Sequence, residues 1–304
     1  MFSYAVGLFA CLLVLYTPLS QLLSGRSPSA APPIRRTPRP AINESLLALD
    51  DWAGNLTCGE DRYSVQLFSK EPLIMYIQGF LSKDERAHLL AISEPVFEPS
   101  TITHNGGAAT QRDQTVRDSE VAVIPRDEVV RCIEARARAI QGWRDEQWIE
   151  RLRTQRYRPG GHYNHHFDWS SSYGGWGRVS SFMAWVDGSP EDEAQPLRGG
   201  GTEFPLVRRA SLHKSWCRFI DCDAKDEVVD PRHGESGGKI AATAKEGGIG
   251  PGVVFKPLAG NAVYWENFRP DGTGRGWDET WHAGLPVTEG IKVGLNIWTW
   301  GRID

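Results

Sequence analysis

The chain has 304 residues and a formal net charge of −4, enough length for one sizeable catalytic domain with flanking segments. This charge balance gives no sign of a nucleic-acid-binding protein, which would carry a basic patch or stripe. Twelve tryptophans, 32 glycines and 19 prolines favour a protein of strands and loops over a helical bundle.

The first 25 residues are mostly apolar and carry no charged side chain. We expect residues 1–25 to be either a signal peptide or a short membrane anchor. The segment is followed by Arg26, Arg35, Arg36 and Arg39. By the positive-inside rule these arginines would keep the downstream chain cytosolic. Two glycosylation sequons, which begin at Asn43 and Asn55, instead suit a lumenal chain.

Residues 26–57 begin with a stretch rich in Ser, Pro and Arg that cannot bury a core, and we expect a flexible linker there. The folded domain is expected over residues 58–304. Within it, the four residues from Ser82 to Glu85 match a capping box and predict a helix that ends near Ile92. Residues 127–141 place their apolar side chains on one face and predict an amphipathic helix.

Strand signals dominate from Trp148 onward. The predicted strands cover residues 149–157, 179–186, 252–256, 262–265 and 292–300. Helices followed by many strands fit an α+β fold, namely a distorted double-stranded β-helix (jelly-roll) core backed by N-terminal helices.

A His-x-Asp pair, His166 and Asp168, is the main chemical signal in the sequence. On an extended strand, residues i and i+2 project to the same face, so both side chains can point into a barrel while Phe167 packs on the other side. His282 is placed to supply a third ligand from another strand. Two histidines and one carboxylate can occupy one face of an octahedral Fe(II) and leave three positions open, which indicates a non-haem iron oxygenase.

The other histidines are expected to be structural or surface residues. His165 alternates to the face opposite His166, and His162 lies outside the ligand pattern. A lysine such as Lys292 would ordinarily be a solvated surface residue. Its fixed offset from His282 and its strand-like apolar neighbours argue instead for a position in the site.

Four of the five cysteines fall within the expected catalytic domain, and the fifth, Cys11, lies in the apolar N-terminal segment. In a lumenal enzyme the four could form two disulfides, whereas in a cytosolic enzyme they would be free thiols. Cys217 and Cys222 could pair locally, and Cys58 with Cys132. Four cysteines allow three pairings, so the sequence leaves the connectivity open.

Several further motifs accompany the His-x-Asp pair in a fixed order. They are Tyr157, Tyr163-x-x-His166-x-Asp168, Gly199-Gly200-x-Thr202-x-Phe204-Pro205, residues 260–265, His282-Ala283-Gly284-x-Pro286-Val287, Gly290-x-Lys292 and Asn296-x-Trp298. With these motifs, residues 70–298 resemble the prolyl 4-hydroxylases, which are 2-oxoglutarate- and Fe(II)-dependent dioxygenases.

The resemblance implies roles for individual residues. The iron ligands would be His166, Asp168 and His282. Lys292 would pair with the distal carboxylate of 2-oxoglutarate, a dianion that needs a charged partner when buried. Tyr157 and Thr202 would donate hydroxyl hydrogens to that same carboxylate. The substrate-binding positions would be Arg178, Trp298 and, close to that arginine, Glu150.

The resemblance also implies an activity. It implies hydroxylation of prolyl residues in a peptide or protein, with consumption of O2, release of succinate and CO2, and a requirement for L-ascorbate. A hydroxylase of a small molecule or secondary metabolite on the same scaffold is the alternative. A third possibility is a non-catalytic binding module, against which stand the intact His166, Asp168, His282 and Lys292. Residues 206–250 read as an insertion, and such loops often set substrate choice.

The resemblance bears on location as well. It favours a single-pass anchor in the endoplasmic reticulum membrane with the catalytic domain in the lumen, and secretion is the alternative.

Overall fold

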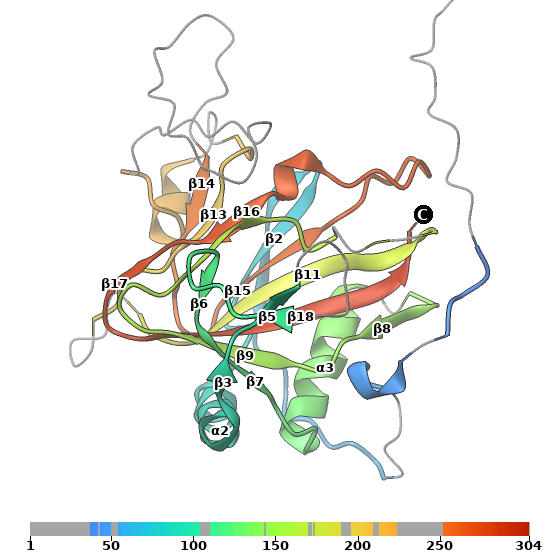
Figure 1. The fold of residues 1–304 in the computed structure, drawn as a ribbon, viewed down its shortest axis with the longest axis horizontal. Helices are drawn as coiled ribbons and strands as arrows, with labels where there is room; N and C mark the ends of the chain where they lie inside the picture. Colours follow the sequence, from blue (N-terminus) through green and yellow to red (C-terminus); the bar gives the residue numbers. More distant parts are fainter. Residues whose placement is uncertain are drawn as a thin grey trace, which may run out of the picture. The chain divides into compact units, whose positions relative to one another are not determined.

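The computed structural model describes residues 37–41, 43–49, 54–103, 110–142, 144–169, 172, 174–189, 196–208, 213–223 and 252–303. This part of the chain is rich in strands and has few helices (Figure 1). Its helices are α2 (Lys83–Ser93), α3 (Glu128–Ile140) and the short 3-10 helices η1 (Glu44–Leu46), η2 (Glu94–Val96), η3 (Lys214–Arg218) and η4 (Asp278–Thr280).

Most strands join one nine-stranded antiparallel sheet, the large sheet. Its members, in spatial order, are β1 (Ser64–Lys70), β2 (Leu73–Gln78), β15 (Ala262–Glu266), β11 (Trp176–Asp187), β18 (Lys292–Arg302), β9 (Arg153–Tyr157), β7 (Glu120–Val123) and β3 (Glu98–Pro99), with β8 (Gln147–Ile149) paired to β18.

A second, five-stranded sheet, the small sheet, carries much of the candidate site. Its order is β14 (Val253–Phe255), β13 (Thr202–Phe204), β16 (His282–Gly284), β10 (His162–His166) and β6 (Arg117–Asp118). Two short ribbons pair β12 (Arg198–Gly199) with β17 (Val287–Glu289) and β4 (Ile102–Thr103) with β5 (Thr110–Gln111).

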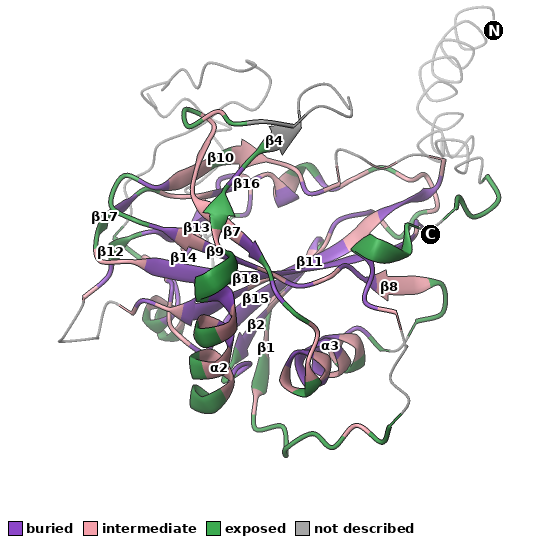
Figure 2. Ribbon diagram, turned by 60° about the horizontal axis from the view of Figure 1, so that its bottom comes forward, coloured by how far each residue is buried: buried purple, intermediate pink, exposed green. Residues whose placement is uncertain are grey.

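The two α-helices cover one face of the large sheet (Figure 2). Val293, Leu295 and Ile297 alternate along β18 and pack in one cluster with Leu89 of α2 and Ile133 of α3. The strand period of two therefore sends every second residue of β18 to the helices and the residues between them to the opposite face.

An aromatic cluster fills the space between the two sheets. Trp185 and Trp265 of the large sheet pack with Phe204 and Phe255 of the small sheet. The Phe204 ring meets Trp265 edge-on at 5.2 Å and Phe255 edge-on at 5.9 Å. Edge-to-face pairs of this kind are favoured by the ring quadrupoles, so this cluster holds one sheet against the other.

Both predicted α-helices are present where the sequence places them. Ser82 and Glu85 form the reciprocal hydrogen bonds of a capping box at the start of α2. Asp127 caps α3 by accepting a hydrogen bond from the Val130 N–H. The predicted order, with helices first, is wrong, because the hairpin β1–β2 precedes α2. The continuous apolar run in β2 has no clear period, so the sequence pattern does not separate it from a buried helix.

The predicted strand over residues 149–157 is interrupted. It divides into β8 and β9, and between them the backbone groups of Arg151 and Leu152 bond to segments other than β18. Glu150 N–H donates to the Trp298 carbonyl, Arg151 N–H to Leu46, and the Leu152 carbonyl accepts from Ile124 N–H. Glu150 therefore lies outside β9 and does not follow the alternation of side-chain faces along that strand.

Part of the segment expected to be a linker contacts the large sheet. Leu47 forms a β-bridge with Glu150, and the buried Ala48 donates its N–H to the Ile149 carbonyl. The division of the chain at residues 25 and 57 stays a prediction. Residues 1–25 lie outside the described residues, and no helix in the described part is long and apolar enough to cross a bilayer.

Two disulfides resolve the open pairing of the cysteines. Cys58 bonds Cys132 and so ties the chain before β1 to α3, while Cys217 bonds Cys222 within one turn-rich segment. Of the three possible pairings of these four cysteines, this is the one that joins Cys217 to its near neighbour in sequence, Cys222.

Candidate metal centre

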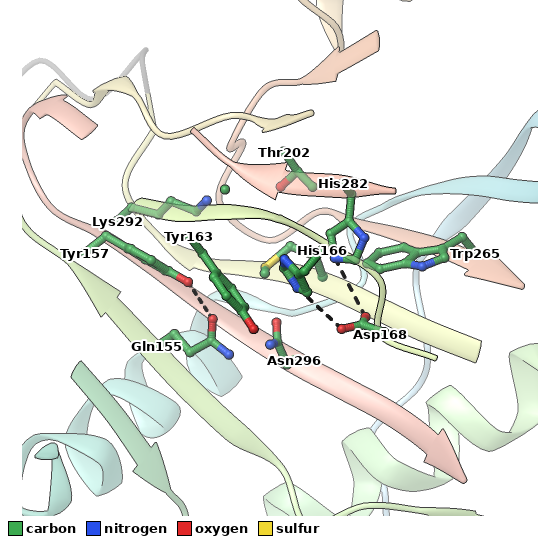
Figure 3. A pocket seen from close by; sticks show the side chains of 12 residues that line it. Gln155, Tyr157, Tyr163, His166, Asp168, Thr202, Trp265, His282, Lys292 and Asn296 are labelled. Carbon is green, nitrogen blue, oxygen red and sulfur yellow. Dashed lines mark hydrogen bonds and ion pairs between the residues drawn. The ribbon is translucent and has the colours of Figure 1, made fainter. Parts of the chain in front are cut away.

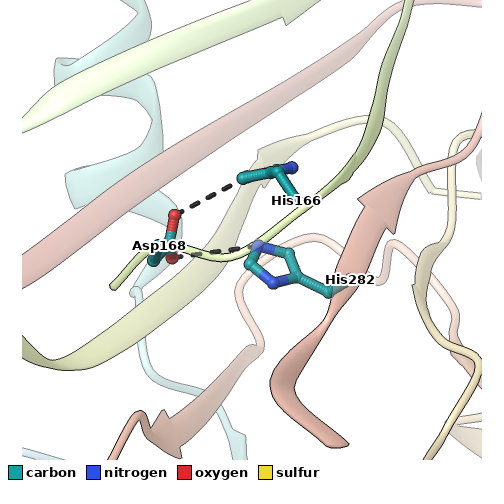
Figure 4. A group of neighbouring side chains, drawn as sticks. All are labelled: His166, Asp168 and His282. Atoms are coloured by element: carbon teal, nitrogen blue, oxygen red, sulfur yellow. Dashed lines mark ion pairs between the residues drawn. The ribbon is translucent and has the colours of Figure 1, made fainter. Parts of the chain in front are cut away.

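Two neighbouring strands of the small sheet bring the two candidate histidines together. His166 at the end of β10 pairs in register with His282 at the start of β16. With Asp168 they form a cluster in which one ligand atom from each residue lies within 4.8 Å of the others (Figure 4). The structure therefore brings the three residues predicted as iron ligands to one point.

Asp168 reaches this point from a turn and not from the strand. The sequence predicts both members of the His-x-Asp pair on one strand, but β10 ends at His166. The Asp168 carboxylate nevertheless lies 3.6 Å from His166 Nε2 and 3.8 Å from His282 Nε2. The carboxylate therefore joins the cluster although Asp168 lies outside the strand.

Backbone carbonyls orient both imidazoles in the same way. The Nδ1 atoms of His166 and His282 lie 2.8 Å from the carbonyl oxygens of Asn164 and Thr280, each two residues earlier in the chain. A carbonyl oxygen can only accept, so Nδ1 must carry the proton and donate it. Nε2 then presents its lone pair toward the cluster, as a metal ligand requires.

Charge states in the cluster also suit a metal ion. Burial lowers the pKa of His282 to about 4, with a further contribution from His166, so the imidazole is neutral at neutral pH. Burial opposes ionisation of Asp168, but His282 and His166 outweigh it and hold the pKa of this carboxyl well below its usual range. The centre therefore offers two imidazole nitrogens and one carboxylate as ligands.

A bulge in β10 places Tyr163 against the cluster. The register between β10 and β16 shifts between Tyr163 and His166, so residues three apart face the same side. Their rings stack at a centroid distance of 3.7 Å. On the outer side of Tyr163 the Arg117 guanidinium lies 4.6 Å from the ring centroid.

The cluster forms one end of a pocket between the two sheets (Figure 3). The lining residues are Gln155, Tyr157, Tyr163, His166, Asp168, Met183, Thr202, Trp265, His282, Gly284, Lys292 and Asn296. Six of the residues predicted for iron or 2-oxoglutarate thus line a single pocket.

Lys292 enters the pocket from β18 of the large sheet and is only 1% exposed. Its Nζ donates to the Gly200 carbonyl at 2.6 Å and lies 5.1 Å from the Tyr157 ring centroid. Burial alone lowers the pKa of this ammonium to about 8. No carboxylate of a described residue pairs with this buried cation, which suits an anionic ligand because such a ligand would compensate the lost hydration.

Two further polar atoms in the pocket lack a partner. Thr202 Oγ1 and Gln155 Nε2 are buried and make no hydrogen bond to a described residue. Tyr157 donates its hydroxyl to Gln155 Oε1 at 2.7 Å, so that amide holds the phenol in place. Unsatisfied buried donors are costly, and a ligand that accepts hydrogen bonds from them would remove the cost.

The three residues predicted to contact substrate form a separate unit beside the lining residues. Arg178 and Glu150 make a bidentate ion pair at 2.7 and 2.9 Å. The Arg178 guanidinium also lies over the Trp298 ring, 3.9 Å from its centroid. Arg178 is close enough to lower the pKa of Asp168, which places this unit next to the candidate metal centre.

Some lining residues have no role in the sequence prediction. Gln155 and Asn296 share the faces of Tyr157 and Lys292 by the strand period of two, so counting alternate positions on β9 and β18 would have found them. Met183 carries no such signal. His165, predicted not to bind metal, pairs with Glu203 at 2.7 Å and packs against Trp281.

Comparisons with known proteins identify curated relatives of this chain. No family model matches the chain. Prolyl 4-hydroxylase 5 of Arabidopsis thaliana is 25% identical over 77% of this chain and 70% of its own length. Prolyl 4-hydroxylase 2 of the same plant is 25% identical over 77% of this chain and 69% of its own length. The predicted resemblance to the prolyl 4-hydroxylases is confirmed by these relatives.

Among solved structures, a viral collagen prolyl hydroxylase from Paramecium Bursaria Chlorella virus-1, in its 2OG complex, aligns with a TM-score of 0.48 and 22% identity. The alignment covers 75% of this chain and 96% of the viral one.

Proposed function

We propose that the protein is an Fe(II)- and 2-oxoglutarate-dependent dioxygenase that hydroxylates prolyl residues of a peptide or protein. The observation that carries this proposal is the joint occurrence, in one pocket, of two imidazoles, one carboxylate and a buried lysine that has no carboxylate partner among the described residues. The curated relatives named as prolyl 4-hydroxylases support the choice of substrate.

The donor set fits Fe(II). His166, Asp168 and His282 offer two nitrogen atoms and one oxygen, the facial set typical of non-haem iron oxygenases. Their Nδ1–H bonds to backbone carbonyls orient the rings and make the nitrogen ligands more basic. Trp265 and Phe204 lie beside His282 and limit access of water to that ligand.

The rest of the pocket fits 2-oxoglutarate. Lys292 would hold the distal carboxylate, and Thr202 Oγ1 would donate to it in place of the hydrogen bond it now lacks. Tyr157 of β9 is the register partner of Lys292, and its hydroxyl would supply a further donor on leaving its hydrogen bond to Gln155. When bound, iron and 2-oxoglutarate together supply the oxidative chemistry, with dioxygen as oxidant and succinate and CO2 as products. Ascorbate would keep the iron reduced.

The proposal extends to the fold and to substrate binding. We infer that the two sheets form a distorted double-stranded β-helix, which the aromatic cluster between them supports. Arg178, held by Glu150, and Trp298 would contact the prolyl segment of the substrate beside the metal centre. Most of residues 206–250, the expected substrate-selecting insertion, lies outside the described residues.

We further propose an endoplasmic reticulum location with the catalytic domain in the lumen and residues 1–25 as the membrane anchor. Two disulfides support an oxidising compartment. Both sequon asparagines, Asn43 and Asn55, are exposed, as glycosylation requires.

The experiment that tests the activity is succinate release by the purified full chain with Fe(II), 2-oxoglutarate and ascorbate. A proline-rich peptide should stimulate succinate formation and gain one oxygen atom per event, whereas the same peptide with alanine for proline should do neither. Succinate formation that no peptide stimulates would move the substrate to small molecules. Absence of succinate in every condition would overturn the dioxygenase assignment.

A further inference from the structure

Arg153 lies on the face of the large sheet that borders the pocket, next to residues that line it. Arg153 begins β9, and it shares a strand face with Gln155 and Tyr157, both of which line the pocket. Thr154, between them in sequence, points to the other face, where its hydroxyl bonds Ser93. Arg153 therefore extends the pocket lining along β9 by about 7 Å beyond Gln155.

Arg153 belongs to a group that we call the arginine cluster, made of Arg117, Arg153 and Arg178. The Trp298 ring lies between two of them, with its centroid 3.9 Å from Arg178 Cζ and 5.7 Å from Arg153 Cζ. Arg117 approaches from β6 of the small sheet and lies over Tyr163. The three guanidiniums thus border the metal-centre end of the pocket from both sheets.

Among the described residues, the three guanidiniums of the arginine cluster share one carboxylate, that of Glu150. Glu150 is engaged in a bidentate pair with Arg178. Arg153 Nε and Arg117 Nη2 are buried and have no hydrogen-bond partner among the described residues. Burial, together with the positive charges of Arg178 and Arg117, lowers the pKa of Arg153, and Glu150 opposes this only in part.

The other arginine of β9, Arg156, has carboxylate partners. Arg156, on the opposite face, bonds both Glu94 and Glu120 and has its pKa raised by them. The arginine that faces away from the pocket is therefore bonded to two carboxylates, whereas no carboxylate of a described residue bonds Arg153.

The iron and cosubstrate of the proposed function would not neutralise the arginine cluster. The two charges of Fe(II) are balanced by those of 2-oxoglutarate, and Asp168 balances Lys292. Three guanidiniums and the one carboxylate of Glu150 then leave two positive charges at the pocket. Charge-assisted hydrogen bonds to a carboxylate are the strongest way to satisfy such groups.

We propose that Arg153, assisted by Arg117, binds a carboxylate of the substrate and so selects acidic proline-containing peptides. This inference rests on the proposed function and names its substrate class. An extended peptide advances by about 3.3 Å per residue, so a carboxylate two residues from the target proline would lie about 7 Å from it, the span from Gln155 to Arg153 along β9. It would come from an Asp or Glu side chain or from a peptide C-terminus.

The test compares matched peptides on the full chain. One proline-rich peptide carries Gln two residues to either side of the target proline, and its partner carries Glu at the same positions. A second pair ends two residues after the proline with a free or an amidated C-terminus. Hydroxylation of each peptide gives kcat/KM, and fluorescence anisotropy of labelled peptides gives their affinity for the metal-free protein.

We expect the Glu peptide to exceed the Gln peptide about tenfold in kcat/KM and in affinity. In Arg153→Gln the preference should shrink to less than about twofold. The matched control Arg158→Gln removes an exposed guanidinium that pairs with Glu120 near the end of the same strand, and it should keep the preference. The C-terminal pair shows whether a main-chain carboxylate serves in place of the side chain.

Equal use of Glu and Gln peptides by the native protein would overturn the inference and leave the proposed function standing. A preference that persists unchanged in Arg153→Gln would also overturn it. If Arg153→Gln does not fold, the native protein and the peptide pairs still decide. If no peptide is hydroxylated, the proposed function fails, while anisotropy on the metal-free protein still tests the carboxylate site.

Discussion

At the scale of single residues, the ligand geometry depends on backbone atoms. The carbonyls of Asn164 and Thr280 fix which nitrogen of His166 and His282 carries the proton. Each carbonyl belongs to the residue two positions before its histidine, so the same local arrangement is used twice. The two imidazole rings are thereby oriented before a metal ion binds, which reduces the entropic cost of ordering the ligands on binding.

Loss of a ligand should abolish metal binding without loss of the fold. We expect Asp168→Ala or His282→Ala to weaken binding of Fe(II) or Co(II) by more than about 100-fold, since replacing even an outer-shell partner of a ligand costs 10- to 100-fold. The measurement is metal content after dialysis, alongside circular dichroism. His165→Gln, which changes a histidine paired with Glu203, should retain the metal. Full metal content in either ligand variant would contradict the assignment.

Lys292 should set the affinity for 2-oxoglutarate and its dependence on pH. The pKa of Lys292 is about 8 in the ligand-free protein, so the ammonium loses its proton above that pH and the dissociation constant should rise there. Lys292→Met should weaken binding at least about 30-fold, the cost of removing one partner of a buried charge pair. Lys256→Met changes a lysine that also donates to a carbonyl, that of Cys217, and should leave binding unchanged. Isothermal titration from pH 6 to pH 9 would measure both effects.

The same lysine should lower the stability of the ligand-free protein. Its pKa is below the ordinary value, so the unfolded chain binds more protons between about pH 8 and pH 10.4, and stability rises with pH across that window. Below pH 8 the cost of burying the ammonium is fully present. Lys292→Met should therefore raise the free energy of unfolding at pH 7 by about 1 to 3 kcal/mol and remove this pH dependence. A less stable variant in urea unfolding would contradict this.

At the scale of elements, the two disulfides close loops of very different length. Cys58–Cys132 closes a loop across 74 positions and anchors the chain before β1 to α3, whereas Cys217–Cys222 spans 5. Loop-closure entropy predicts a loss of about 4 kcal/mol for Cys58→Ser with Cys132→Ser, and about 2 kcal/mol for Cys217→Ser with Cys222→Ser. Guanidinium unfolding of both double variants would show this order, and the reverse order would rule out the entropic account.

At the scale of the whole molecule, aromatic side chains pack between the two sheets that form the pocket. Phe204 of the small sheet packs on Trp265 of the large sheet and stacks 5.5 Å from the His282 ring. Phe182 is equally buried, but it packs toward the helices with Phe80 and Tyr264. Substitution of Phe204 should therefore affect both the core and the site, whereas substitution of Phe182 should affect the core alone.

Phe204→Leu and Phe182→Leu should each lower the free energy of unfolding by about 1 to 2 kcal/mol. Only Phe204→Leu should also weaken metal binding, because it loosens the ring that packs against His282. Parallel thermal unfolding and metal titration would measure both quantities. Equal metal affinity in the two variants would show that the sheet interface does not position the ligand.

The sequence by itself determined the chemistry and the local structure. The His-x-Asp pair, His282 and Lys292 named the pocket residues, and the capping box at Ser82 and the apolar period of residues 127–141 placed both α-helices, because such signals act over a few residues. Only the tertiary structure decided that Asp168 lies beyond β10, that a bulge turns Tyr163 onto His166, and that no carboxylate of a described residue bonds Arg153 on the pocket face. Those features depend on register between strands far apart in the chain, and a one-residue shift in register reverses which face a side chain occupies.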